Sequence, residues 1–308
     1  MMEHRKLNNK VLPVNKSVGV STYDCIRKFK RVARIRKVGH SGSLDPIARG
    51  LILLLTGEAT KLSNYLMDLS KRYVADIIMG EATDTQDTSG RVLKTGPWGH
   101  ISEDQVREVL PRFVGSRMQT PPMFSALKHH GTPLYTLARR GQEIDRRPRK
   151  VETYELELVA FDPPVFRISV FCSRGLYVRM LAEEIGEALH VPTHLYGLVR
   201  TNIGHFDLET AVSDDEFGSL LAEEEPGYTL SEAVRHLPEV PLSLDQAKRL
   251  ETGIAPKLTT YSGVSLPPQG SVVRMVDPGG KLGAIGEVGA AGYIKIRRVF
   301  RDIGVSGG

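Results

Sequence analysis

Apolar side chains recur at helical spacing in three segments of the chain. The first segment is residues 21–37, where Ser21 and Asp24, three residues later, resemble a capping box at the start of a helix. The second segment lies around residues 62–69, and the third follows Gly175. The apolar positions that predict the three helices are Ile26, Phe29 and Ala33; Leu62, Tyr65, Leu66 and Leu69; and Val178, Leu181, Ile185 and Leu189.

Two segments before the third helix alternate with period two, as half-buried strands do. Strands and helices are mixed along the chain without a regular βαβ order, which predicts an α+β fold and not a Rossmann fold. The residues expected to share one face of each strand are Tyr154, Leu156, Leu158 and Ala160 in one, and Phe166, Ile168, Val170 and Cys172 in the other.

The pattern changes near residue 238. Leu237-Pro238-Glu239-Val240-Pro241 is typical of a linker, and the sequence after it is rich in Gly and short apolar runs such as residues 271–276. Such runs suit a small β-barrel or sandwich. At 308 residues the chain is long enough for one large and one small domain, and we place them at 1–236 and 237–308.

The charge of the chain is compatible with a polyanionic partner. The net charge is +5 and the isoelectric point is about 9.1. Seven of the eleven residues from Arg27 to Lys37 are Lys or Arg, with no acidic residue among them. This run predicts a surface that faces phosphates, and a solvated helix face is the alternative.

Other properties restrict the compartment. The two cysteines, Cys25 and Cys172, are too few for a disulfide scaffold and form no CxxC metal pair, so a reducing cytoplasm is expected. The longest apolar run, Leu51–Leu55, is too short to span a bilayer, and the basic start of the chain has no secretory signal behind it.

Candidate chemistry concentrates in residues 38–50, which read VGHSGSLDPIARG. Three glycines permit a tightly folded loop, and Pro46 favours an extended backbone at Asp45, which would present its carboxylate. From composition alone, an ordinary Gly/Asp-Pro turn remains the alternative.

This segment resembles the signature of the TruB family of tRNA pseudouridine synthases, a Gly-His-Thr-Gly-x-Leu-Asp-Pro core followed by Gly-x-Ala-Thr-Lys. The similarity covers about residues 11–205, although the family's usual Lys-Pro-x-Gly stands here as Lys16-Ser17-Val18-Gly19. Further matching blocks are Gly57–Lys61, Lys71–Tyr73, Asp84–Asp87, Pro121–Lys128, Leu134–Gly141, Cys172–Arg179 and Leu198–Thr201.

The resemblance implies a role for six residues. Asp45 matches the nucleophilic aspartate, Arg179 the arginine that pairs with it, and Tyr73 the tyrosine that stacks on the target base. Tyr177 and Leu198 match residues that bound the uridine pocket, and His40 matches the histidine that pushes on the T loop. Because Tyr177 and Arg179 are two residues apart, we expect both on one side of an extended strand end.

These residue types suit the reaction that the family catalyses. The N1–C1′ bond must break, the base must turn while it stays trapped, and C5 must join C1′. The net reaction uses no redox equivalent, so we expect no cofactor and no metal. A carboxylate nucleophile in a desolvated pocket needs a permanent cation beside it, and the uridine must be flipped out of its stack.

The resemblance also implies a fold and a partner. We expect a mixed or antiparallel sheet with helices and loops around a central cleft, an RNA-binding insertion at about residues 121–150, and a C-terminal PUA-like RNA-binding domain. Gly253, Gly283–Val288 and Ile294–Phe300 carry that last similarity. The partner would be the T arm of tRNA, bound by a monomer that needs no protein partner.

Two alternatives remain open. One is the related guide-RNA-dependent enzyme, which lacks the long insertion after Pro-Pro-x-x-Ser-Ala; the insertion present here, through Gly131, Tyr135 and Arg139, favours the stand-alone enzyme. The other is a non-catalytic tRNA-binding or tRNA-folding factor. Intact Asp45, Tyr73 and Arg179 argue against it, although a folding role can coexist with catalysis.

Overall fold

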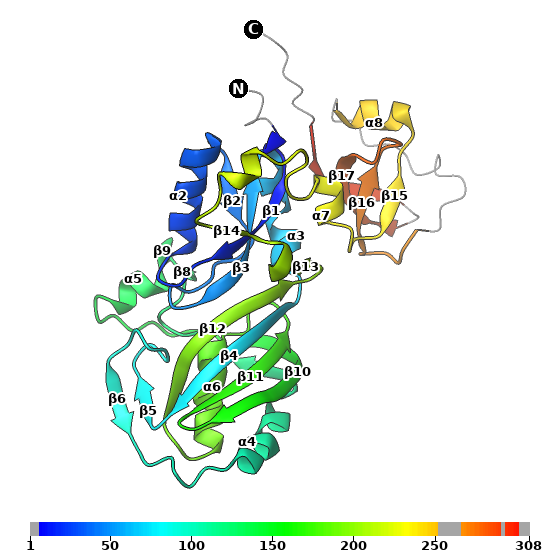
Figure 1. Cartoon of the computed structure of the whole chain (residues 1–308). Helices are drawn as coiled ribbons and strands as arrows, with labels where there is room; N and C mark the ends of the chain where they lie inside the picture. The colour runs from blue at the N-terminus through cyan, green and yellow to red at the C-terminus, as the bar shows by residue number, and fades with distance from the viewer. Residues whose placement is uncertain (1–5, 252–265, 291–292, 302–308) are drawn as a thin grey trace.

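A large mixed sheet organises the first and longer part of the chain (Figure 1). The computed structural model describes residues 6–251, 266–290 and 293–301. The strands of the large sheet, in spatial order, are β14 (Val212–Ser213), β1 (Val11–Lys16), β3 (Arg49–Thr56), β12 (Thr193–Ile203), β4 (Lys71–Met79), β11 (Val165–Cys172), β10 (Arg149–Asp162) and β7 (Gly115–Gln119), with β2 (Val38–His40) beside β3 and β13 (Phe206–Asp207) beside β12.

Most strand pairs in this sheet are antiparallel, but β1 with β14 and β3 with β12 are parallel. The mixed sheet with helices packed on it confirms the expected α+β class for this part of the chain. Helix α6 (Val178–Ala188) packs on β12 and β4. Further helical segments of this part are η1 (Gly57–Leu62), α3 (Ser63–Met67), α4 (Glu103–Val109), η2 (Leu110–Phe113), η3 (Leu208–Thr210), η4 (Ser219–Leu221) and α7 (Leu230–Ala233).

Helix α2 (Thr22–Ala33) is the helix expected over residues 21–37. The capping box is confirmed, because the Ser21 hydroxyl accepts from the backbone N–H of Asp24 and the Asp24 carboxylate accepts from that of Ser21. The expected end is wrong: the helix stops at Ala33, because Arg34 adopts a left-handed conformation with φ of 53°. The expected apolar face is confirmed, since Ile26, Phe29 and Ala33 are buried.

The two predicted strands are present, and one of them deviates from simple alternation. In β11 all four expected residues are buried, including Phe166 and Cys172. In β10 Leu156 and Leu158 are buried, but Tyr154 is 44% exposed and Ala160 is also exposed. Register shifts on both sides of the buried pair turn these two side chains outward, as β-bulges do.

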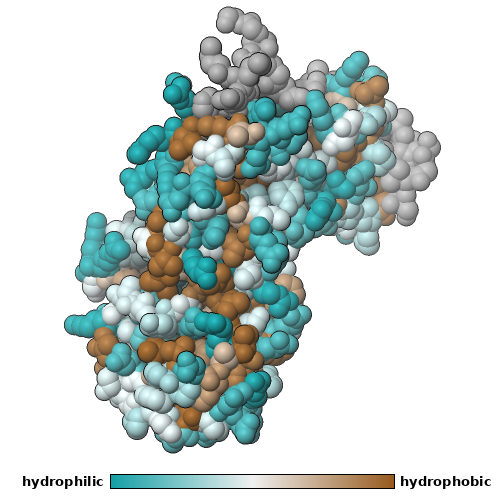
Figure 2. All heavy atoms as spheres, in the orientation of Figure 1, coloured by the Kyte–Doolittle hydropathy of each residue, from teal (hydrophilic) through white to brown (hydrophobic). Residues whose placement is uncertain are grey.

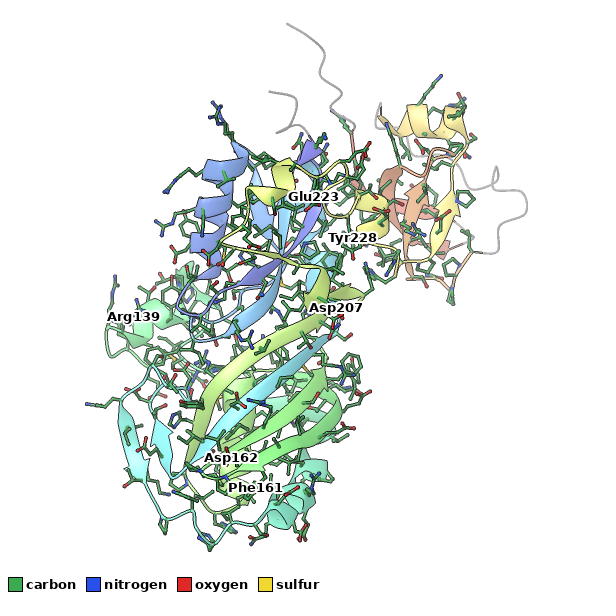
Figure 3. The ribbon with its side chains drawn as sticks, in the orientation of Figure 1. Arg139, Phe161, Asp162, Asp207, Glu223 and Tyr228 are labelled. Atoms are coloured by element: carbon green, nitrogen blue, oxygen red, sulfur yellow. The ribbon has the colours of Figure 1, made fainter. Side chains whose placement is uncertain are left out.

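Between β7 and β10 the chain leaves the sheet, and this segment contains most of residues 121–150, where an RNA-binding insertion is expected. It forms the hairpin of β8 (Lys128–His129) and β9 (Thr132–Pro133), followed by α5 (Leu134–Ala138). Figure 3 shows Arg139 at the outer edge of this segment. A second hairpin, β5 (Glu81–Thr83) with β6 (Val92–Thr95), lies between β4 and α4.

The C-terminal part is a separate sheet that shares a core with the first. Its strands are β15 (Glu239–Pro241), β16 (Val272–Val276), β17 (Leu282–Val288) and β18 (Ile294–Val299), and α8 (Leu244–Glu251) packs on β17. The expected linker at 237–241 is therefore wrong in part, because β15 pairs with β16. The four strands do not close into a barrel within the described residues; Gly253 lies outside them.

Strand β3 lies between two apolar clusters, which explains its unbroken apolar run. Ile52 and Leu54 belong to the main core, whereas Leu51, Leu53 and Leu55 face a second cluster. The C-terminal sheet contributes Val276, Leu282, Ile285 and Phe300 to this second cluster. No helix in the described residues is long and apolar enough to cross a membrane.

Candidate active site

The loop that carries Asp45 joins β2 to β3 and is held from several sides. The N–H of Ala48 donates to the Asp45 carbonyl at 3.1 Å and closes a turn with Pro46 at its second position. The fully buried Lys16 donates to the Ala48 carbonyl at 2.6 Å, and the N–H of Gly19 donates to the Pro46 carbonyl at 2.7 Å. The N-terminal motif has Ser17 where the family usually has Pro, but Lys16 and Gly19 of the same motif still contact the loop.

Gly50 allows β3 and β12 to meet directly after this loop. Its φ is 108°, and a Cβ there would lie 2.5 Å from the Arg200 carbonyl oxygen. The parallel pairing sets Arg200 beside Gly50, so the guanidinium of Arg200 reaches the Leu51 carbonyl at 2.6 Å and the Ser43 carbonyl at 3.3 Å. This close approach brings the end of the Asp45 loop against β12.

The structure brings Asp45 and Arg179 into an ion pair. The Arg179 Nε donates to Asp45 Oδ2 at 2.8 Å, its Nη1 to the Thr85 carbonyl at 2.8 Å and its Nη2 to the Phe124 carbonyl at 2.7 Å. The Arg179 side chain is 4% exposed, but that of Asp45 is 39% exposed. A buried cation that donates from all three of its nitrogens therefore holds a carboxylate that remains partly exposed.

A second carboxylate, Asp87, lies near the same nitrogen of Arg179, with its Oδ2 at 3.6 Å from the Arg179 Nε. Its Oδ1 accepts from the Thr85 hydroxyl at 2.7 Å and from the Ser89 N–H at 2.9 Å. The turn is formed by Gln86 in a left-handed conformation with φ of 60°. Asp87 therefore fixes the position of Arg179 but is too deeply buried, at 4% exposed, to meet a substrate.

Tyr73 and Leu198 come from adjacent antiparallel strands. Tyr73 on β4 lies directly opposite Arg200 on β12, and Leu198 lies opposite Ala75. Tyr73 and Leu198 are each 8% exposed. Burial raises the pKa of the Tyr73 hydroxyl, and the nearby Arg200 charge opposes this shift, so Tyr73 is protonated at neutral pH.

Tyr177 is placed at the start of α6 by Gln119 on β7. The Gln119 side chain accepts from the Tyr177 N–H at 2.9 Å and donates to its carbonyl at 3.3 Å. The guanidinium of Arg149 lies 4.9 Å from the centre of the Tyr177 ring. The expected strand end is wrong: Tyr177 is extended, but Arg179 is already inside α6, so the two side chains leave the backbone differently.

His40 lies at the end of β2, directly before the Asp45 loop. Burial lowers the pKa of its ring, and the charge of Arg200 lowers it further, so the ring is neutral at pH 7. The six residues singled out in the sequence thus come from β2, β4, α6, β12 and their adjoining loops.

Three further residues complete this arrangement and were not assigned a role from the sequence. Asp87 and Arg200 fall inside blocks that match the family. The signal in the sequence was that each is a charged residue within a family motif. Gln119 precedes the Pro121 block and gave no signal, because its double hydrogen bond to Tyr177 depends on β7 being near α6.

Comparison with known proteins identifies the family. The family model described as TruB family pseudouridylate synthase (N terminal domain) matches residues 30–178. A protein of Syntrophotalea carbinolica named tRNA pseudouridine synthase B is 37% identical over 305 residues, covering 97% of this chain and all of that protein. The chain belongs to the TruB family of pseudouridylate synthases.

A second relative carries the same name, and a solved structure shares the fold. A protein of Geobacter sulfurreducens, also named tRNA pseudouridine synthase B, is 39% identical over 246 residues, which is 79% of this chain and 81% of that protein. A chain of the crystal structure of a Cbf5-Nop10-Gar1 complex has the same fold, with a TM-score of 0.75 and 22% identity over 97% of this chain and 87% of that one.

Proposed function

We propose that this TruB-family chain isomerises uridine to pseudouridine at position 55 in the T loop of tRNA, without a guide RNA, and that Asp45 is the nucleophile. The observation that supports this most strongly is the Asp45–Arg179 ion pair. It leaves the carboxylate partly exposed and paired with a cation that cannot lose its charge, and the charge of Asp45 acts on the buried Tyr73.

The proposed steps follow from the groups around this pair. Asp45 attacks the flipped nucleotide to form a covalent adduct, and the N1–C1′ bond breaks. The base turns in the pocket, C5 bonds to C1′, and the bond between Asp45 and the nucleotide breaks, which restores the carboxylate. The proton on C5 then leaves and one returns to N1, so the product is an isomer of the substrate. Arg179 orients Asp45 for this attack through their ion pair, because its other hydrogen bonds anchor it to Thr85 and Phe124.

Tyr73 is proposed to hold the base during its rotation. A phenol with a raised pKa keeps its proton, so it accepts a ribose proton only after passing its own to another group. The flat ring has no such requirement, and this favours the stacking role. Tyr177 and Leu198 are proposed to bound the same pocket.

His40 is proposed to be the wedge that fills the place of the flipped base. Its neutral ring can enter a base stack without bringing a charge into it. His40 lies at the end of β2, and the loop that follows carries Asp45. The residue that would displace the base is therefore close in the chain to the residue that would attack it.

The stand-alone mode is supported by the segment between β7 and β10. The hairpin of β8 and β9 with α5 projects from the sheet there, and it carries exposed basic residues such as Arg139 and Arg140. We propose that this segment holds the T arm and that residues 237–308 form a PUA-like RNA-binding domain. A monomer in the cytoplasm is the simplest form of such an enzyme.

The direct test is to incubate the purified chain alone with an unmodified tRNA transcript and map pseudouridine at nucleotide resolution. Modification at position 55 only, with no added RNA or protein, is expected. Modification that appears only with a guide RNA would refute the stand-alone mode. Tight binding without any pseudouridine would indicate a tRNA-folding factor instead.

A further inference from the structure

Helix α2 presents a continuous basic face to solvent. Cys25, Ile26 and Phe29 point into the core, so the helical period places Arg27 and Arg31 on the opposite side, and Arg34 follows directly after the last residue of the helix. These three arginines are exposed. In Figure 2 hydrophilic side chains cover the outer edge of the molecule along this helix.

Much of this charge is not neutralised by the protein. Arg27 pairs with Asp24 and Lys28 with Asp215. Among the described residues, no carboxylate lies within ion-pair distance of four other exposed cations on this helix and the segment after it, namely Lys30, Arg31, Arg34 and Arg36. Unpaired cations this close together repel one another, so the binding of a polyanion that covers them is favourable.

The same helix also offers an aromatic side chain. Tyr23 is 67% exposed, and the Arg27 guanidinium lies 5.4 Å from its ring centre. An exposed tyrosine beside arginines is a surface on which a nucleic-acid base can stack. This second feature favours RNA over a protein partner.

The helix starts at the active-site loop and leads away from it. The Thr22 hydroxyl accepts from the Leu44 N–H at 3.1 Å, one residue before Asp45. The twelve residues of α2 span about 18 Å, a length over which a nucleic-acid duplex carries roughly ten phosphate charges. The basic face therefore extends from the proposed catalytic loop outward, and its four unpaired cations are nearest the far end.

The C-terminal sheet lies on the other side of the catalytic half. In Figure 1 α2 and the sheet of β15 to β18 flank β1 and β3 on opposite sides. Lys295 and Arg298 are exposed on the C-terminal sheet. If the stem of the T arm runs straight from the pocket toward that sheet, it does not cover α2. Whole tRNA is L-shaped with the T loop at its corner, so a second part of the molecule extends in another direction.

We propose that the basic face of α2 and of the segment after it, formed by Arg27, Lys30, Arg31, Arg34 and Arg36, binds the phosphodiester backbone of tRNA outside the T-arm stem-loop. This inference rests on the proposed function, because it takes the T loop as the occupant of the catalytic pocket. The face then distinguishes whole tRNA from an isolated stem-loop that contains the same uridine.

The test compares two RNAs with one charge-reduced variant of the full chain. In Arg31→Gln/Arg34→Gln, fluorescence anisotropy with whole tRNA should show weaker binding, by up to about 60-fold at 0.1 M salt for two lost contacts. The slope of log affinity against log salt should become shallower by up to about 1.8. Binding of a T-arm stem-loop should stay unchanged.

The matched control is Arg107→Gln/Arg112→Gln, which removes the same charge from α4 and η2 at the far end of the sheet. It should bind both RNAs as the parent does. Equal weakening of the α2 variant on both RNAs would assign the face to the T arm and overturn the proposal. Unchanged binding to both would mean that the face is merely solvated, which also overturns it.

A failure of the proposed function can be distinguished from a failure of this inference. If the unaltered chain forms no pseudouridine in either RNA, the assigned chemistry is wrong, whereas the difference in binding between the two RNAs still reports on α2. Thermal unfolding of each variant should match that of the parent, because all four altered side chains are exposed.

Discussion

Replacement of Arg179 by Lys is the most informative single perturbation of this site. The guanidinium donates from three nitrogens to Asp45, Thr85 and Phe124, and Asp87 lies near the same Nε. A lysine keeps the positive charge but has one nitrogen on a flexible stem, so it cannot reach all four groups together. The substitution therefore removes geometry and retains charge.

The expected loss of rate follows from the hydrogen-bond acceptors that the substitution leaves without a donor. The Thr85 and Phe124 carbonyls lie in buried or partly buried contacts with Arg179. Each buried acceptor left unsatisfied costs about 1–3 kcal/mol, so the two together cost roughly 2–6 kcal/mol. If that energy is lost in the transition state, the rate falls about 30-fold to 10⁴-fold.

The assay is single-turnover pseudouridine formation in a T-arm stem-loop, with enzyme in excess so that product release does not limit the rate. Urea unfolding of the same variant separates lost stability from lost chemistry. The control is Arg167→Lys, since Arg167 makes a two-bond pair with Asp76 on the exposed face of the sheet. An exposed pair contributes about 0–1 kcal/mol, so this control should keep the parent rate.

A rate within a few-fold of the parent in folded Arg179→Lys would refute the reasoning. It would mean that charge alone supports Asp45 and that the bonds to Thr85 and Phe124 are incidental. A loss of stability with an unchanged rate would assign the whole network to folding.

Three further predictions concern other parts of the molecule. Asp45→Asn should fold and bind tRNA but form no pseudouridine, because the amide keeps the shape and lacks the nucleophile; turnover near the parent rate would remove Asp45 from the mechanism. Burial lowers the pKa of His205 from 6.5 to about 4, so folding opposes its protonation and stability is lost as pH falls through this window. His205→Gln should reduce the loss of unfolding free energy between pH 7 and about 4.5 by about 1–2 kcal/mol, as measured by urea unfolding. The same pH dependence in both proteins would contradict this. The 1–236 fragment retains the proposed catalytic residues and should isomerise a stem-loop, but with a lower melting temperature, because the cluster that contains Leu51, Leu53 and Leu55 loses its members from the C-terminal sheet; melting at the parent temperature would mean that these members add no stability.

Local patterns in the sequence predicted two of the helices and the residues of the proposed site. The capping box at Ser21 and the apolar positions of α2 and α6 depend on contacts within a few residues, so they could be predicted directly. The family motifs likewise named Asp45 and Arg179 before any geometry was known. Their separation of 134 residues is closed only by the fold.

Some features depended on longer contacts and could not be predicted. Bulges in β10 turned Tyr154 and Ala160 outward, because register is set by the partner strand and not by the strand's own alternation. The end of α2 at Arg34 depends on one left-handed residue, which the charge pattern does not reveal.

The tertiary structure alone decided what supports the site. Asp87 and Gln119 act on Arg179 and Tyr177 through side chains that meet only after β7, the Asp87 turn and α6 are packed together. The apolar run of β3 is a similar case. The sequence showed that Leu51–Leu55 was too short to cross a membrane, and the structure showed why every residue in it is apolar. Both faces of that strand are buried, one by the catalytic core and the other by a cluster that the C-terminal sheet completes, and burial on two sides is a property of the assembled layers and not of the strand itself.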